Sequence, residues 1–167
     1  AIFLRSVVSL PPLLILALRA KSLLQKYSKK NKRLIIIRIL AEIGTTVTFL
    51  TALKYMPLAN VTAIAQSLPL AITMAAALFL GEQVGWRRWS AILIGFTGVL
   101  IIIRPGLAGF NSYSLVALSS VILLTIREIS TRKLDSEIPT VTVAFSTTLG
   151  ITVFAALPLI GSEWVEV

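Results

Sequence analysis

The stretch LANVTAIAQSLPLAITMAAALFL, residues 58–80, decides the fold of this 167-residue chain. It contains no charged residue, and none occurs anywhere between Tyr55 and Gly81. As an α-helix rising about 1.5 Å per residue it would be roughly 35 Å long, which exceeds the hydrocarbon core of a bilayer at about 30 Å. The apolar run is continuous, unlike the alternating pattern of a membrane β-barrel strand. These residues therefore predict a transmembrane α-helix.

Five more apolar stretches lie on either side of it, at residues 2–18, 34–53, 89–103, 114–131 and 138–160. Two of them are short for a span, and their strong neighbours favour a spanning role for them. Only 14% of the chain is charged, whereas soluble domains carry about 25%. That is too little polar surface to face water on all sides. The pattern predicts an all-α polytopic membrane protein that is a bundle of six helices.

The basic residues are distributed unevenly over the connections. Residues 19–33 contain seven Lys or Arg and no acid, whereas the following connection contains only Lys54. Arg87 and Arg88 lie in the next connection, and residues 127–133 contain a further basic cluster. Because basic connections stay in the cytoplasm, this alternation predicts six crossings with these three connections inside. We therefore expect a multi-pass protein of the cytoplasmic membrane.

Aromatic residues support the predicted ends of the spans. Tyr and Trp prefer the headgroup level of a bilayer because their rings are amphipathic. Five such residues fall at the ends of the apolar stretches: Tyr55, Trp86, Trp89, Tyr113 and Trp164.

Several kinds of chemistry are excluded by composition. The chain has no Cys and no His, so disulfides, thiolate catalysis, haem ligation by these residues and ordinary zinc sites are ruled out. No Gly-rich phosphate loop and no nucleophile motif occur. We predict no cofactor, no metal site and no catalytic residue. The net charge of +9 does not indicate nucleic-acid binding, because the basic residues lie between long apolar runs.

The third stretch contains the first candidate site. Pro69 lies near its middle and cannot donate a backbone hydrogen bond, so a kink is expected there. Thr62, Gln66, Pro69 and Thr73 follow the spacing i, i+4, i+7, i+11 and share one helix face. A kinked span with a polar stripe is typical of a cavity wall. The alternative is an ordinary kink whose Thr and Gln bond to neighbouring helices.

The second and first stretches contain ionisable residues, which are expensive inside a membrane. Arg38 and Glu42 are four residues apart and can pair. Arg38 could instead extend to the interface, whereas Glu42 is the only acid well inside a stretch and is the candidate protonatable site. Arg5, early in the first stretch, could bind an anionic group, pair with an acid, or reach outward.

The fourth stretch has a face of small residues, Ala91, Gly95 and Gly98. Small side chains let helix backbones approach closely, so this face predicts helix packing and no chemistry.

Residues 51–106 resemble the EamA-type proteins of the drug/metabolite transporter superfamily. The similarity consists of A-L-x-Y at 52–55, a turn with Pro and Ala-Asn, a Pro-broken helix, L-G-E at 80–82 and R-P-G at 104–106. The opening FLRSVVSLPPLLILALR, residues 3–19, is similar to the second span of that family.

The resemblance implies a ten-helix inverted-repeat transporter fold with substrate bound near the bilayer midplane between two five-helix repeats. Residues 1–106 would be most of the first repeat without its first helix, and residues 107–167 the start of the second. We therefore expect a fragment that comprises helices two to seven. The last stretch departs from the pattern, because residues 146–148 are uncharged where the resemblance leads us to expect a charge.

Arg5, Pro69 and Glu82 match family positions. The resemblance does not make Glu82 a substrate residue: we expect it to cap the end of the third span and to pair with Arg87 or Arg88.

The predicted function is secondary transport of small metabolites or drugs. Five residues are the predicted substrate site: Arg5, Glu42, Gln66, Pro69 and Thr73. The expected partners are membrane lipids and a small-molecule substrate, with no nucleic acid, and a homodimer is left open. The alternatives are a membrane-embedded lipid-handling protein or enzyme whose catalytic part lies elsewhere, and a bundle that does not transport.

Overall fold

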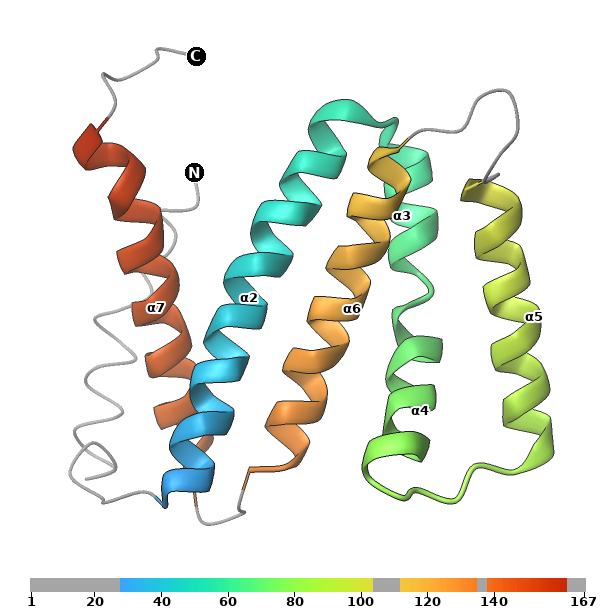
Figure 1. Ribbon diagram of the computed structural model, residues 1–167, viewed down its shortest axis with the longest axis horizontal. Helices are drawn as coiled ribbons and strands as arrows, with labels where there is room; N and C mark the ends of the chain where they lie inside the picture. Colours follow the sequence, from blue (N-terminus) through green and yellow to red (C-terminus); the bar gives the residue numbers. More distant parts are fainter. Residues whose placement is uncertain (1–27, 104–111, 135–137, 162–167) are drawn as a thin grey trace. The chain divides into compact units, whose positions relative to one another are not determined.

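The computed structural model describes residues 28–103, 112–134 and 138–161, with side chains as far as Phe154. The first predicted span, residues 2–18, lies outside the described residues. The helices are α2 Lys29–Tyr55, α3 Leu58–Ala65, α4 Leu68–Phe79, α5 Trp86–Ile103, α6 Tyr113–Arg132 and α7 Thr140–Gly161 (Figure 1). No strand occurs among the described residues. The predicted all-α fold class is confirmed.

Among the described residues, four segments are long and apolar enough to cross a membrane: Lys29–Tyr55, Leu58–Phe79, Trp86–Ile103 and Tyr113–Arg132. Three of them extend the predicted stretches by one to five residues at an end, and Leu58–Phe79 ends one residue before the predicted end at residue 80. The fourth stretch, predicted from residue 89, begins at Trp86 and so reaches a length of 18 residues. The apolar part of α7 that can be assessed, Thr140–Phe154, is shorter than these four.

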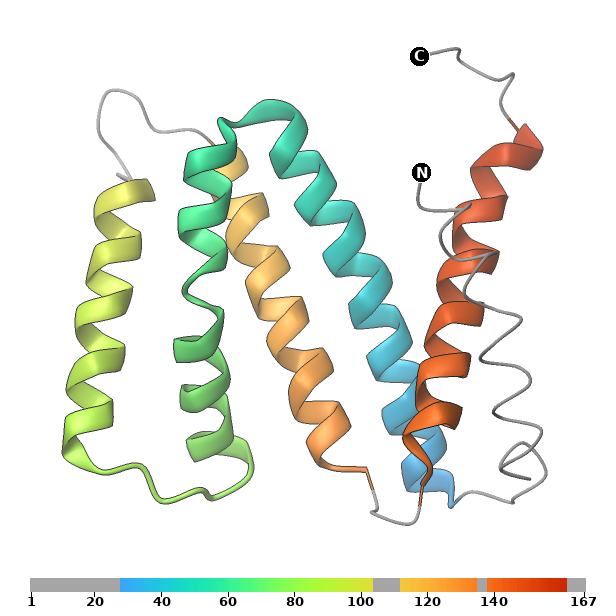
Figure 2. The same ribbon diagram turned by 180° about the vertical axis from the view of Figure 1, so that it is seen from behind.

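The described helices fall into two compact units, one formed by residues 44–133 and the other by residues 1–43 and 134–167. This division does not follow the predicted repeat boundary at residue 106, and that boundary stays a prediction. In the first unit, α3 and α4 lie between α5 and α6 (Figures 1 and 2). The broken third span is therefore the centre of this unit.

Small residues allow the helices of residues 44–133 to approach closely. The buried cluster contains Ala52 from α2, Ala71 from α4 and Ala117 from α6 beside larger apolar side chains such as Ile64 and Val121. Because lipid tails are as apolar as these side chains, the helices associate mainly through van der Waals packing. The close fit of small against large side chains supplies that packing.

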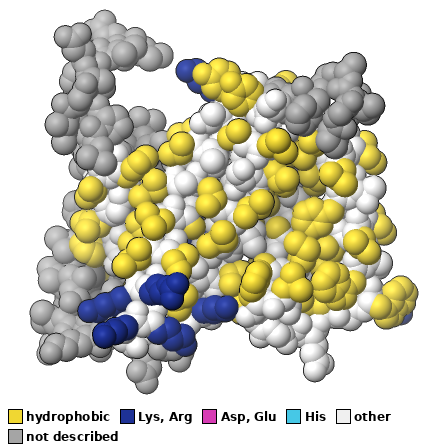
Figure 3. Space-filling model, viewed as in Figure 1, with side chains coloured by type: hydrophobic (Ala, Val, Ile, Leu, Met, Phe, Trp, Pro, Cys, Tyr) yellow, Lys and Arg dark blue, Asp and Glu magenta, His cyan; other side chains and the backbone are white. Residues whose placement is uncertain are grey.

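Large apolar side chains also cover the outside of the same helices. Leu78, Leu93, Ile94 and Ile101 are each at least 64% exposed, and Figure 3 shows hydrophobic side chains spread over one face of the molecule. A soluble protein rarely exposes so much contiguous apolar surface. A lipid environment removes that penalty, in agreement with the membrane prediction.

The second unit contains the first part of α2 together with α7. A side chain at Gly150 of α7 would meet Ile39 of α2, so the glycine permits their close contact. Lys and Arg side chains gather where α2 begins (Figure 3), and Lys29, Lys32 and Arg33 there are exposed.

Candidate functional site

The third span is interrupted at Gln66 and Ser67, between the end of α3 and the start of α4. The sequence predicted a kink at Pro69, and the structure places Pro69 in the first turn of α4 instead. Proline is tolerated in a first turn because its missing N–H would have no partner within the helix. The helix therefore ends and restarts just before the proline.

The interruption changes which backbone carbonyls are bonded. Pro69 has no N–H to donate to the carbonyl of Ala65, four residues earlier. The N–H of Leu70 donates to the carbonyl of Ser67 at 3.0 Å and not to that of Gln66. The carbonyls of Ala65 and Gln66 thus lose their usual helical donors near the middle of a membrane span.

Ser67 stabilises the break from inside the bundle. Its side chain is 2% exposed, and its Oγ donates to the carbonyl of Ile64 at 2.7 Å. Its own carbonyl accepts from Leu70 and Ala71. The serine therefore satisfies backbone groups on both sides of the interruption, and sequence reasoning missed this role because a lone Ser in an apolar run gives no spacing signal.

The residues of the predicted polar stripe on the third span are mostly exposed. Thr62, Gln66 and Pro69 are exposed, and Thr73 is half-buried. The hydroxyl of Thr62 donates to Leu58 at 2.9 Å, and that of Thr73 donates to Pro69 at 2.8 Å. These hydroxyls therefore offer a ligand an acceptor oxygen, whereas the exposed amide of Gln66 offers both donors and an acceptor.

Glu42 lies in α2, and its side chain is half-buried. Its Oε2 atom is shielded from solvent. Three residues further along α2, the Oγ1 of Thr45 is also buried and has no hydrogen-bond partner among the described residues. Glu42 and Thr45 of α2 therefore both place polar atoms away from solvent.

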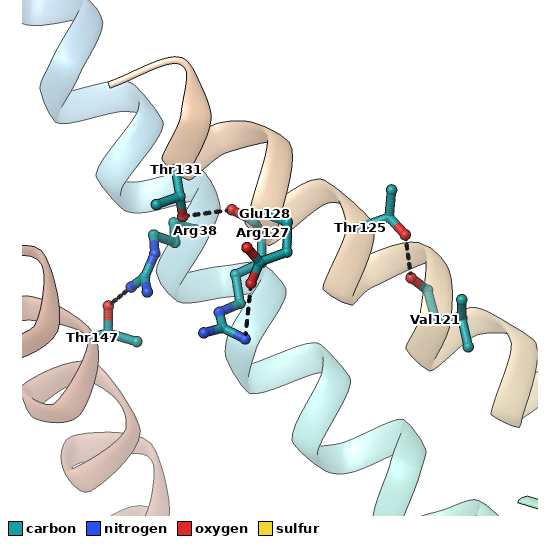
Figure 4. Close-up of polar contacts among 7 residues, drawn as sticks. All are labelled: Arg38, Val121, Thr125, Arg127, Glu128, Thr131 and Thr147. Carbon is teal, nitrogen blue, oxygen red and sulfur yellow. Dashed lines mark hydrogen bonds and ion pairs between the residues drawn. The ribbon is translucent and has the colours of Figure 1, made fainter. Parts of the chain in front are cut away.

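Arg38, one turn before Glu42, donates a hydrogen bond from Nη1 to the Oγ1 of Thr147 in α7 (Figure 4). Thr147 is buried and donates its own hydroxyl proton to Val143 at 2.7 Å. The guanidinium is thus directed at a neighbouring helix, although an extension to the interface had been the alternative. Sequence spacing could not reveal this contact, because Thr147 lies 109 residues away.

The five predicted site residues do not all lie in one compact unit of the described structure. Gln66, Pro69 and Thr73 lie together on the broken span, within residues 44–133. Glu42 belongs to the other compact unit. Arg5 lies outside the described residues. No group of three or more potential metal-binding side chains occurs in the described part of the chain.

The prediction that Glu82 pairs with Arg87 or Arg88 is wrong. Its Oε1 accepts from Nη1 of Arg132 at 3.0 Å, and it pairs with neither Arg87 nor Arg88. The reason is the end of α4: Gly81 has φ of 70°, and the N–H of Glu82 donates back to the carbonyl of Ala76 at 3.3 Å. This turn directs the carboxylate toward α6 and away from the start of α5.

Together these features define a class of protein. A span broken near its middle leaves backbone carbonyls and polar side chains available inside a membrane, where irregular backbone is tolerated only beside protein or a water-filled cavity. The molecule is a polytopic helical membrane protein with a discontinuous span, the kind of element that lines binding sites in secondary transporters.

The chain belongs to the EamA-like transporter family, whose model matches residues 1–104. This confirms the resemblance proposed from the motifs.

Its relatives are named as transporters. It is 35% identical over 96 residues to a riboflavin transporter of Rhizobium johnstonii, covering 58% of this chain and 32% of the relative. It is 26% identical over 112 residues to an S-adenosylmethionine uptake transporter of Rickettsia bellii, covering 67% of this chain and 38% of the relative. It is 27% identical over 120 residues to a pseudopaline exporter of Pseudomonas aeruginosa, covering 71% of this chain and 42% of the relative.

The chain thus spans about two fifths or less of the length of these relatives. No solved structure matches it. The names of the relatives agree with the prediction that the protein is not an enzyme.

Proposed function

We propose that the full-length protein is a secondary transporter of small metabolites. The observation that carries this proposal is the interruption of the third span at Gln66 and Ser67, which frees the carbonyls of Ala65 and Gln66 within the membrane. Free carbonyl groups of this kind can replace the water molecules around a polar substrate or a coupling ion. The free-energy cost of ordering them is small, because the helix is already interrupted before the ligand binds.

The substrate class is polar or amphipathic and small. The exposed amide of Gln66 can donate and accept, and Thr73 can accept, while the surrounding half-helices are apolar. A ligand with ring or chain surface and a few hydrogen-bonding groups fits this lining. The relatives are named for riboflavin, S-adenosylmethionine and pseudopaline, which supports this class without selecting a member.

Two ionisable residues complete the proposed site. Glu42 is the candidate proton carrier, because an acid within a span is costly unless it serves function. Arg5 is the candidate partner for an anionic group of the substrate. Their roles stay predictions, as does the arrangement of residues 1–106 and 107–167 in two inverted repeats. A homodimer stays a prediction.

The test is transport by the full-length protein reconstituted in liposomes against a panel of labelled metabolites. For the transported compound, Gln66→Ala should lower the initial uptake rate about 5- to 10-fold, as expected for one lost hydrogen bond in a dry site. Pro69→Ala should also lower uptake, because it restores an N–H for Ala65 and favours a continuous helix. Glu42→Gln should abolish the dependence of uptake on an imposed proton gradient.

A pair of threonine variants distinguishes a loss at the proposed site from the general effect of removing a threonine hydroxyl from a membrane helix. Thr73→Val and Thr97→Val each remove a hydroxyl bonded at 2.8 Å to the carbonyl four residues earlier. Thr97 is exposed on α5, a helix that is not part of the broken span. Thr73→Val should lower uptake, whereas Thr97→Val should leave it unchanged. Normal uptake by the Gln66, Pro69 and Glu42 variants together would show that this site assignment is wrong.

A further inference from the structure

A second polar feature lies at the start of α5, where the sequence reads Trp86-Arg87-Arg88-Trp89. All four residues are exposed, and Trp86 reaches 76%. The guanidinium of Arg87 lies over the ring of Trp86, 5.8 Å from its centroid. We call these four residues the α5 basic patch.

The α5 basic patch has no acidic partner within the described chain. The first turn of α5 contains no acid. Glu82, the acid on the connection that leads into it, is paired with Arg132 at 3.0 Å. Neither Arg87 nor Arg88 forms an ion pair with a described residue. Two positive charges at adjacent helix positions are therefore exposed and accessible to an anion.

The position of the patch indicates which kind of anion it would meet. Trp86 begins a span that is long and apolar enough to cross the membrane, so the patch is at a membrane surface. Tryptophan rings settle at the headgroup level and would hold the two arginines at that depth. Arginine binds phosphate in a bidentate manner through its planar group of donors, whereas lysine acts as a point charge.

We propose that the α5 basic patch binds the phosphate group of an anionic phospholipid, with Arg87 and Arg88 as the ligands and the two tryptophans against the upper acyl chain and glycerol region. The site is separate from the broken span, and it requires only that α5 spans the membrane. Its effect is to anchor the start of α5, next to the turn at Gly81 that connects α5 to α4.

The experiment measures lipid retained by the full-length protein in native mass spectrometry, after titration with phosphatidylglycerol or with phosphatidylcholine. The wild-type protein should retain phosphatidylglycerol in preference to phosphatidylcholine. The double variant Arg87→Gln/Arg88→Gln should bind phosphatidylglycerol about 30-fold more weakly, because the charge-assisted hydrogen bonds of the guanidinium groups to the phosphate are lost.

Two controls make the result decisive. Lys29→Gln/Lys30→Gln removes the same charge from exposed positions at the start of α2. It should change the affinity much less, because it leaves the arginine hydrogen bonds to the phosphate intact. Equal losses in the two double variants would overturn the proposal, because binding would then follow net charge alone. Inorganic phosphate should not displace the lipid; displacement at equal concentration would show a free-phosphate site instead. Circular dichroism of each variant establishes that the helices are retained.

Discussion

Glu82 and Arg132 join the end of α4 to the end of α6 through an ion pair of 3.0 Å. Both side chains are nearly half exposed, at 47% and 46%. An exposed pair contributes little, about 0.2–1 kcal/mol, because water and salt screen it. Its importance is geometric, since it links helices that the chain separates by 50 residues.

Reversal of these charges tests the pair. Glu82→Arg and Arg132→Glu should each lower the melting temperature of the full-length protein, since each places like charges together. The double variant should recover most of the loss, with a coupling energy of at most about 1 kcal/mol that falls in high salt. The readout is thermal unfolding in detergent at two salt concentrations. Additive losses in the double variant would mean that the two side chains do not interact.

Packing between helices α4 and α5 depends on one glycine. A Cβ at Gly95 would collide with Leu70 of α4, whereas a Cβ at Gly98 would meet nothing within 4 Å. The sequence predicted that Ala91, Gly95 and Gly98 form one packing face, but Ala91 is exposed and Gly98 faces open space. Only Gly95 therefore requires its small size for this contact.

We expect Gly95→Val to lower stability by about 1–3 kcal/mol, because either the tip of Leu70 must leave its present rotamer or α5 must shift to admit the larger side chain. Gly98→Val is the matched control on the same helix, and it should lower stability by much less. The comparison is made by thermal unfolding of the two variants. Similar losses would show that helix propensity, and not contact with α4, determines the cost.

The distribution of basic residues predicts the orientation of the spans in the membrane. This orientation can be measured with single cysteines, because these 167 residues contain no Cys. Single cysteines at Asn60, Ser112 and Gln83 would each lie at an exposed position. In intact cells, a membrane-impermeant maleimide should label the first two and spare Gln83, whose connection leads to the basic residues Arg87 and Arg88. The opposite labelling pattern would contradict the predicted orientation, and labelling after cell lysis controls for reactivity.

The spans and the candidate polar residues on them could be predicted from the order of residues alone. Residues 58–80 and 114–131 are close to the observed segments, because a bilayer imposes the same requirement, a length of apolar helix, on each span separately. Pro69 likewise indicated a disruption, since proline always lacks the donor.

The exact break at Gln66 and Ser67, the contact between Arg38 and Thr147, and the pairing of Glu82 with Arg132 required the folded structure. Each depends on a group brought close by packing, such as the buried Ser67 or a side chain 50 or 109 residues away. Local physics therefore specifies where the helices are, whereas the partners of polar groups within the bundle are selected by neighbours that only folding brings together.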